Sequence, residues 1–201
     1  HDILFTIYSL ALKFLRKIPY QKEKHKDDPA YQYEDTISLG PWTSSSYLRD
    51  PIHLTFVLAR YKFCAKILTG KKRILEIGCG DAFGTPIVAQ NCDRLYAIDI
   101  DPKIIASNRE RMSKIKNIKF EVMDFRQSIP DNRFDGVFSI DVIEHIEKQY
   151  TQIFMRNTVN ILEKDGICII GTPNITAKKY ASPQSKKYHI NWQSFKSLRE
   201  L

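Results

Sequence analysis

The sequence predicts an α/β fold with a doubly wound parallel sheet, and two observations support this. Five short apolar runs alternate with helical patterns, which is typical of parallel strands buried beneath helices on both faces. The runs span 73–77, 95–99, 118–122, 135–140 and 166–171. A glycine-rich turn directly follows the first run, and the second run ends in the carboxylate Asp99. A chain of 201 residues, 43% of them hydrophobic, is enough for one core.

The turn after the first strand predicts a ligand site. Gly78, Gly80 and Gly84 allow the backbone to bend tightly and to approach a ligand without a side chain in the way. Asp99 lies 21 residues after Gly78, close to the spacing at which an acidic residue at the end of the second strand binds a ribose diol. The pattern therefore predicts a nucleoside pocket.

The charge around the turn indicates which nucleoside is bound. A dinucleotide fingerprint has its third glycine one residue earlier than Gly84, and its helix N-terminus faces a pyrophosphate. Glu76 and Asp81 add negative charge that would repel a pyrophosphate but suits a cationic ligand such as a sulfonium with an ammonium group. A nicotinamide oxidoreductase is therefore disfavoured, although it remains an alternative, as does a domain of this fold that has lost its ligand.

Four blocks in order carry a family resemblance. They are Glu76 to Gly80, Tyr96 to Asp101, Val122 to Phe125, and Phe134 to His145. Over roughly residues 55–200 the chain resembles the class I S-adenosylmethionine (SAM)-dependent methyltransferases, whose Rossmann-like sheet has the order 3-2-1-4-5. The resemblance implies SAM as cofactor, with Asp99 on the ribose, Asp124 on the adenine amino group, and Ile100 and Phe125 beside the ring. The implied cofactor-binding residues are Glu76, Gly78, Cys79, Gly80, Asp81, Asp99, Ile100, Asp124 and Phe125.

The end of the chain departs from this family. Its members normally add a helix and two more strands after the fifth strand, whereas here the sequence ends in a predicted helix over 191–201. Either the chain is truncated or a partner covers the edge of the fifth strand, because an exposed edge is an aggregation hazard. A homo-oligomer through that edge is one such arrangement.

The fourth block contains the candidate metal-binding and catalytic residues. Asp141, Glu144 and His145 have i, i+3, i+4 spacing, so on a helix they share one face, and they suit Mg²⁺ or Mn²⁺. The block resembles the Glu-x-x-Glu-His of ubiquinone-pathway O-methyltransferases and, more weakly, of the enzymes that methylate the 2′-hydroxyl at small-RNA 3′ ends. Both add a later histidine, for which His189 is the candidate. Asp141 replaces their glutamate, and the 44 residues between His145 and His189 match neither group. The favoured alternative is a helix cap by Asp141, with Glu144 three residues later.

The resemblance implies an in-line methyl transfer to a small-molecule or sugar-type acceptor, most simply at oxygen. His145 and Asp141 are then the candidate catalytic residues, with His145 as the base, because an imidazole titrates near neutral pH. Residues 172–174 resemble a loop that closes the acceptor side. Two alternatives remain: an RNA 2′-O-methyltransferase, and a non-catalytic subunit with this fold.

The net charge of +8 lies mostly in the last thirty residues. Residues 172–201 carry six basic side chains and one acidic one, while residues 71–171 are neutral, with 15 of each. This basic segment follows the carboxyl end of a strand, where ligands bind in open α/β sheets. It can be a solvated loop or can attract an anionic small molecule, with nucleic acid possible but not favoured.

The remaining expectations concern the first part of the chain and its compartment. Within residues 1–36 the sequence predicts an apolar helix (3–18) followed by a polar linker. The helix could pack on the domain, on a second subunit or on a membrane surface. A signal peptide would carry its positive charges first, whereas Lys13, Arg16 and Lys17 come at the end of the apolar run. Residues 37–70 predict a lid and a helix from Asp50-Pro51, before a SAM-binding domain over 71–201. Tyr31, Tyr33, Trp42 and Tyr47 are candidate walls for the acceptor.

Four cysteines without metal spacing indicate free thiols in the cytoplasm, and there is no apolar run of about 20 residues to span a membrane.

Overall fold

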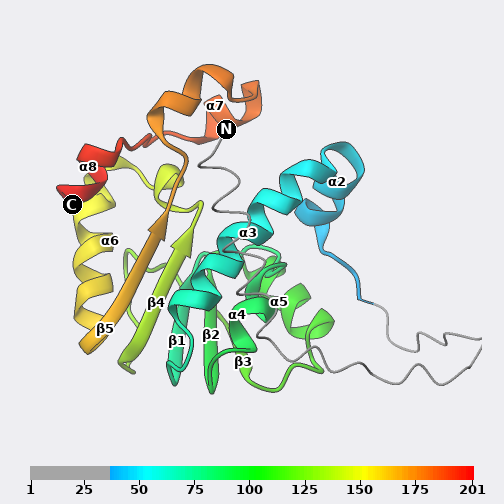
Figure 1. Cartoon of the computed structure of the whole chain (residues 1–201), viewed down its shortest axis with the longest axis vertical. Helices are drawn as coiled ribbons and strands as arrows, with labels where there is room; N and C mark the ends of the chain where they lie inside the picture. Colours follow the sequence, from blue (N-terminus) through cyan, green and yellow to red (C-terminus); the bar gives the residue numbers. More distant parts are fainter. Residues whose placement is uncertain (1–36) are drawn as a thin grey trace, which may run out of the picture. The chain divides into compact units, whose positions relative to one another are not determined.

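A computed structural model describes residues 37–201, which form one compact unit built on a five-stranded parallel sheet. The strand order is β3-β2-β1-β4-β5, so the predicted fold class and strand order are confirmed (Figure 1). The strands are β1 (Arg73–Ile77), β2 (Arg94–Asp99), β3 (Ile118–Val122), β4 (Phe134–Ile140) and β5 (Leu162–Gly171). Every pairing between neighbours is parallel, and the predicted strand positions agree within a few residues at the ends.

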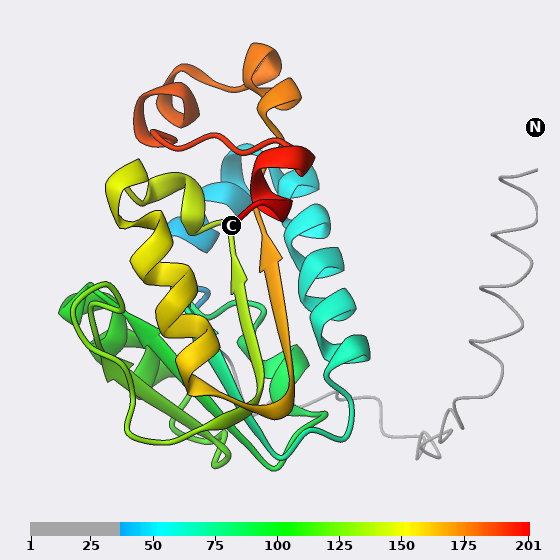
Figure 2. The same cartoon turned by 90° about the vertical axis from the view of Figure 1, so that its left-hand side faces the viewer.

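Helices cover both faces of the sheet, as the apolar character of the strands requires. One core lies beneath α3 (Pro51–Ile67), α4 (Thr85–Ala89) and α5 (Pro102–Arg111). The other core lies beneath α6 (Lys148–Ile161), where Phe154 and Ile161 pack on strand residues such as Leu75 and Val137. Figure 2 shows α3 and α6 on opposite sides of the strands. The central strands β1 and β4 are therefore largely buried, whereas the edge strands β3 and β5 are more exposed. At the centre of the sheet, ligand access is left to the strand ends.

Two helices begin as the sequence predicts. The Asp50 side chain accepts a hydrogen bond from the amide of His53, and Pro51 is the first residue of α3. The Asp101 side chain accepts from the amides of Lys103 and Ile104, and Pro102 begins α5. A capping carboxylate followed by a proline with a helix-compatible φ fixes each start.

Short elements gather above the carboxyl ends of the strands (Figures 1 and 2). They are α2 (Pro41–Arg49), η1 (Ile143–His145), η2 (Ile175–Tyr180) and α7 (Pro183–Tyr188). The predicted helix over 191–201 is wrong in extent, because α8 spans only Phe195–Arg199. Asn191 and Gln193 instead have buried side chains that make hydrogen bonds in extended chain. The helix starts later, at the cap Ser194.

Within residues 37–201, no strand pairs with the outer edge of β5, so the sheet has five strands there as expected. The prediction that a partner covers this edge remains a prediction. None of the helices described is long and apolar enough to cross a membrane. The predicted helix over 3–18, the linker after it, Tyr31 and Tyr33 lie outside the described residues.

Candidate functional site: a cavity at the carboxyl ends of the strands

A cavity of about 1000 Å³ opens above the strand ends, where the chain order reverses between β1 and β4. This position is the usual ligand site of an open parallel sheet. The turn after β1 and the ends of β2, β3 and β4 form its floor, and α2, α3 and α7 contribute its walls. The residues that line it include Trp42, Tyr61, Gly78, Cys79, Gly80, Asp99, Ile100, Asp124, Phe125, Arg126, Asp141, His145, Tyr188 and His189.

The glycine turn is held against the end of β2. The amides of Gly78 and Cys79 donate to the carbonyl oxygen of Ile98 at 2.8 and 3.0 Å. Gly78 has φ +75°, and a Cβ there would lie 2.4 Å from Cγ2 of Val142. Gly80 has φ +51°, and a Cβ there would lie 3.3 Å from the Trp42 ring. Both positions therefore need glycine, for the backbone angle as well as for space.

Gly84, the late third glycine, has a different role. A Cβ at this position would lie 2.1 Å from the Tyr61 ring, which comes from α3. Its φ is −93°, which any residue adopts. Gly84 therefore lets α3 pack closely on the start of α4, and it does not line the large cavity.

Asp99 is fixed at the end of β2 and lines the cavity. Its Oδ2 accepts from the amide of Gly80 at 2.9 Å, and its Oδ1 accepts from the amide of Asp101 at 3.0 Å. An ionised carboxylate has about four lone-pair positions, so each oxygen keeps one for a further donor. The carboxylate is thus preorganised to accept two more hydroxyl groups.

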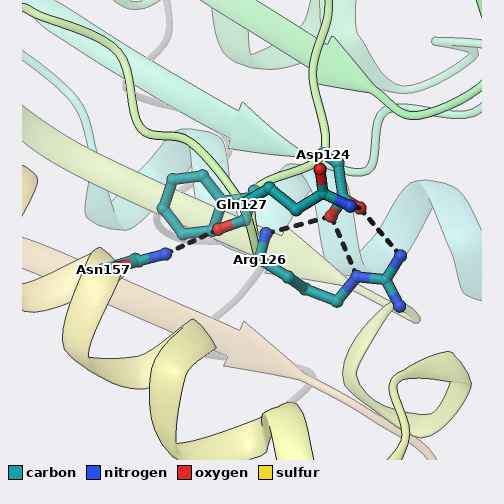
Figure 3. Close-up of polar contacts among 5 residues, drawn as sticks. Asp124, Arg126, Gln127 and Asn157 are labelled. Carbon is teal, nitrogen blue, oxygen red and sulfur yellow. Dashed lines mark hydrogen bonds and ion pairs between the residues drawn. The ribbon is translucent and has the colours of Figure 1, made fainter.

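Asp124 lies one residue beyond Met123 at the end of β3, and its carboxylate is already engaged (Figure 3). Its Oδ1 accepts from the backbone amide and the Nε of Arg126, at 3.0 and 2.9 Å. Its Oδ2 accepts from Nη2 of Arg126 at 2.8 Å and from Nε2 of Gln127 at 2.9 Å. The hydrogen bonds from Arg126 lower the pKa of Asp124, so this carboxylate is ionised.

At the other end of the cavity, Glu144, His145 and His189 come together. One ligand-capable atom from each lies within 4.8 Å of those of the other two. The rings of His145 and His189 meet edge to face, with 4.8 Å between centroids. Thr172 donates to Oε2 of Glu144 at 2.9 Å, whereas Oε1 of Glu144 and Nδ1 of His189 are buried without a partner in the described chain. The sequence prediction that His189 approaches this pair is thus supported by the geometry.

The titration of two of these groups follows from their burial. Burial raises the pKa of Glu144 to about 7. Burial lowers the pKa of His189, and the charge of His145 lowers it further, which favours the neutral imidazole. Neutral imidazole and carboxylate are the forms that bind a metal ion or accept a proton.

Asp141 departs from two of its predicted roles, the helix cap and the metal ligand, while its predicted catalytic role stays a prediction. It forms an ion pair with Arg60 of α3, and its φ is +57°. The short helix that follows begins after Val142 with no side-chain cap, so the prediction that Asp141 caps it is wrong. Asp141 is also absent from the metal-capable group of Glu144, His145 and His189. The 3₁₀ turn spans only Ile143–His145, so Asp141 lies before it, and its positive φ separates it from the regular helix on which the i, i+3, i+4 spacing relied.

Comparison with known proteins identifies the family. The family model "Methyltransferase domain" matches residues 75–170. A ubiquinone biosynthesis O-methyltransferase of Rickettsia akari is 31% identical over 138 residues, which are 66% of this chain and 52% of that protein. A probable S-adenosylmethionine-dependent methyltransferase of Mycobacterium tuberculosis is 29% identical over 101 residues, 50% of this chain and 35% of that protein. Residues 75–170 therefore match a methyltransferase domain, and the chain is similar to SAM-dependent methyltransferases.

Solved methyltransferase structures have the same fold. The N-methyltransferase NodS of Bradyrhizobium japonicum, in complex with S-adenosyl-L-homocysteine (SAH), aligns with a TM-score of 0.60 and 22% identity, covering 70% of each chain. The chain spans about half or less of the length of the curated relatives it matches. SAM is the cofactor of the family, while its members' names include both O- and N-methyltransferases.

Two residues predicted to bind the cofactor do not line the large cavity. Glu76 is buried behind the turn, where its Oε1 accepts from the Tyr61 hydroxyl at 2.7 Å, and burial raises its pKa to about 7. Asp81 accepts from the amide of Thr43 at 2.7 Å and ties α2 to the turn. Cys79, by contrast, does line the cavity. Cofactor contacts from Glu76 and Asp81 therefore remain predictions.

Sequence reasoning missed four residues of this site. Arg60 and Arg126 hold the carboxylates of Asp141 and Asp124, Tyr188 lines the cavity from α7, and Asn191 anchors the segment that carries His189. Only Arg126 had a usable signal, because it follows Asp124 by two residues. The other three depend on contacts between distant parts of the chain.

Proposed function

We propose that the chain transfers the methyl group of SAM to a hydroxyl of a small-molecule acceptor. One observation supports this most directly: a single cavity joins the Gly80 and Asp99 turn to the cluster of His145 and His189. The ribose would lie on Asp99 and the adenine between Ile100 and Phe125. The sulfonium would then face the histidine cluster, where the acceptor enters.

The chemistry requires positioning more than activation. Methyl transfer from a sulfonium is an in-line displacement, and its leaving thioether is neutral, so the protein mainly aligns donor and acceptor and excludes water. Trp42 and Tyr188 line the cavity at its α2 and α7 walls and restrict water entry. A hydroxyl acceptor must also lose its proton, and His145, which lines the cavity, is the base when its imidazole is not bound to a metal ion.

A divalent metal fits the same end of the cavity. Glu144, His145 and His189 would hold it, since Oε1 of Glu144 and Nδ1 of His189 are buried and unpartnered in the described chain. A carboxylate with two imidazoles suits Mn²⁺ or another borderline ion. When bound, such an ion would supply positive charge that stabilises the acceptor oxygen.

The acceptor is proposed to be anionic. Lys178, Lys179, Lys186 and Lys187 lie on η2 and α7, the segment that also supplies the cavity-lining residues Gln184, Ser185 and Tyr188. This basic segment favours an anion at the entrance. RNA is the second candidate, because a basic surface beside exposed tyrosines also suits a nucleic acid end.

The proposed compartment is the cytoplasm. All four cysteines are unpaired, and Cys168 is exposed. Exposed thiols persist in a reducing compartment.

The test is methyl transfer from labelled SAM to a cell extract separated into small-molecule and RNA fractions. We expect label in the anionic small molecules, little transfer by His145→Ala with SAH binding retained, and loss with EDTA that Mn²⁺ or Mg²⁺ restores. Label in RNA alone would support the second candidate. Full activity in EDTA would contradict the metal, and full activity of His145→Ala would contradict the base.

A further inference from the structure

The hydrogen bonding of Asp124 raises a difficulty for adenine binding. The carboxylate accepts four hydrogen bonds, three from Arg126 and one from Gln127. Four is about its full capacity, so no lone pair is left for the N6 amino group of adenine. One of these donors must leave before adenine binds at Asp124.

The cavity side of the carboxylate belongs to Arg126. Residues 123–126 line the cavity, whereas Gln127 is exposed and does not belong to the lining. Figure 3 shows the guanidinium of Arg126 and the amide of Gln127 approaching Asp124 from different directions. A ligand that enters through the cavity therefore meets Arg126, and Gln127 can stay in place.

The backbone of this turn is held in place, and the Arg126 side chain is the freer part. Asn157 of α6 donates to the carbonyl oxygen of Phe125 at 2.7 Å, and Phe125 is only 4% exposed (Figure 3). The Arg126 side chain is 31% exposed, against 16% for Asp124. Its guanidinium already lies over the Tyr150 ring, 5.4 Å from the centroid, and this cation–π contact can hold it when its hydrogen bonds to Asp124 break.

We propose that Arg126 is a latch on the adenine site, which closes on Asp124 when the cavity is empty and opens when SAM enters. This inference rests on the proposed placement of adenine at Asp124. The guanidinium gives up its side-chain hydrogen bonds to Oδ1 and Oδ2 and keeps its contact with the Tyr150 ring, and the N6 amino group takes the freed position. Because a ligand that needs the open state binds with an affinity reduced by the closed fraction, the latch weakens SAM binding.

The test is calorimetric titration of the full chain with SAH. Arg126→Met removes the donors but keeps an unbranched side chain, and we expect it to lower the dissociation constant of SAH by three- to tenfold. The matched control is Arg133→Met. Arg133 directly precedes β4 and donates to the carbonyl oxygen of Leu162, the first residue of β5, at the edge of the sheet opposite the cavity. It does not line the cavity, so Arg133→Met should bind SAH as the unchanged protein does.

A second ligand separates a latch from a change in packing. S-inosylhomocysteine carries an oxygen in place of the N6 amino group, and this oxygen accepts a hydrogen bond from the closed guanidinium. Arg126→Met should therefore bind this analogue no more tightly than the unchanged protein does. If Arg126→Met tightened both ligands equally, or weakened SAH, the latch would be wrong.

The latch and the cofactor site fail in different ways. If SAH binds the unchanged protein and Asp99→Ala weakens it, but Arg126→Met leaves the affinity for SAH the same, the latch alone is wrong. If SAH does not bind the unchanged protein at all, the proposed cofactor site is wrong and the latch with it.

Discussion

The two ends of the cavity are built in different ways. The end proposed to bind the cofactor, here the cofactor end, comes from the tips of β1, β2 and β3, within residues 76–126, and its carboxylates are held by backbone amides or by a neighbouring arginine. The end proposed to bind the acceptor, here the acceptor end, combines residues 141–145 with residues 172–193, and η2 and α7 bury none of their own side chains. The first end is part of the sheet, and the second is attached above it.

A few polar contacts hold the acceptor end in place. The Asn191 amide donates to the carbonyl oxygen of Glu144 at 3.0 Å. The Asn191 side chain donates to the carbonyl oxygen of Ile143 at 3.2 Å and to the Thr151 hydroxyl at 2.9 Å. These bonds bring the segment with His189 to η1. The comparison teaches that the acceptor end can be disturbed without loss of the cofactor end. Of the four predictions below, three examine the cofactor end and the last tests this separation.

The largest effect is expected at Gly80. Gly80→Val should raise the dissociation constant of SAH more than 100-fold, because a branched side chain at φ +51° would strain the backbone, at about 1–3 kcal/mol, and would fill the floor of the cavity. Calorimetry on folded protein measures the loss.

Gly70→Val is the matched control, since Gly70 has φ +81° with nothing within 4 Å of a Cβ. It carries comparable strain but lies outside the cavity lining, so it should lose stability and keep SAH binding. If Gly80→Val bound SAH as tightly as the unchanged protein does, the cofactor would not bind at the Gly80 turn.

The next effect concerns Glu76, behind the turn. Because burial raises its pKa to about 7, the folded protein binds this proton more tightly than the unfolded chain does. The resulting stability is fully present below about pH 4.5 and is lost as the pH rises through about 7. Without ligand, the free energy of unfolding should fall by up to about 3 kcal/mol more in the wild type than in Glu76→Gln between pH 5 and pH 8.

Urea unfolding of both proteins across this pH range makes the measurement. Glu144, whose pKa is also raised to about 7, is present in both proteins, so the difference between the two curves isolates Glu76. Parallel curves would show that Glu76 has an ordinary pKa.

Asp99→Ala should weaken SAM binding by about 1.5–3 kcal/mol, because it removes a charged acceptor for the ribose hydroxyls. Asp101→Ala is the control on the neighbouring carboxylate, which caps α5. That variant should lose about 0.5–2 kcal/mol of stability and bind SAM normally. Equal weakening by both variants, measured by calorimetry, would refute the assignment of Asp99 to the ribose.

The smallest effect addresses the acceptor end. Asn191→Ala should cost about 1–2 kcal/mol of stability, since it leaves buried partners without a donor. It should lower methyl transfer several-fold while SAH affinity is kept. The control is Asn117→Ala, which loses two bonds to backbone carbonyl oxygens of Ala89 and Cys92, away from the acceptor end. If Asn191→Ala weakened SAH as strongly as it lowered turnover, the two ends would not be separable.

The sequence by itself determined the sheet, the glycine turn and the position of Asp99 beside it. The short apolar runs between helical patterns predicted the strand positions. The Asp-Pro pairs predicted the first residues of two helices, and the glycines together with Asp99 predicted the turn after β1. These features are local: a positive φ, a cap or a strand-end carboxylate is set by residues close together in the chain, and parallel strands bring their ends together without further information.

Only the tertiary structure decided the acceptor end. Asp141 met Arg60 instead of capping a helix, and the segment after it became a 3₁₀ turn. Gly84 makes room for the Tyr61 ring. Asn191, where a helix had been predicted, lies before α8, and its side chain donates a hydrogen bond to Thr151. Each of these outcomes depends on a partner from a distant part of the chain, and for a polar side chain the partner that shields it from water determines which local conformation is stable.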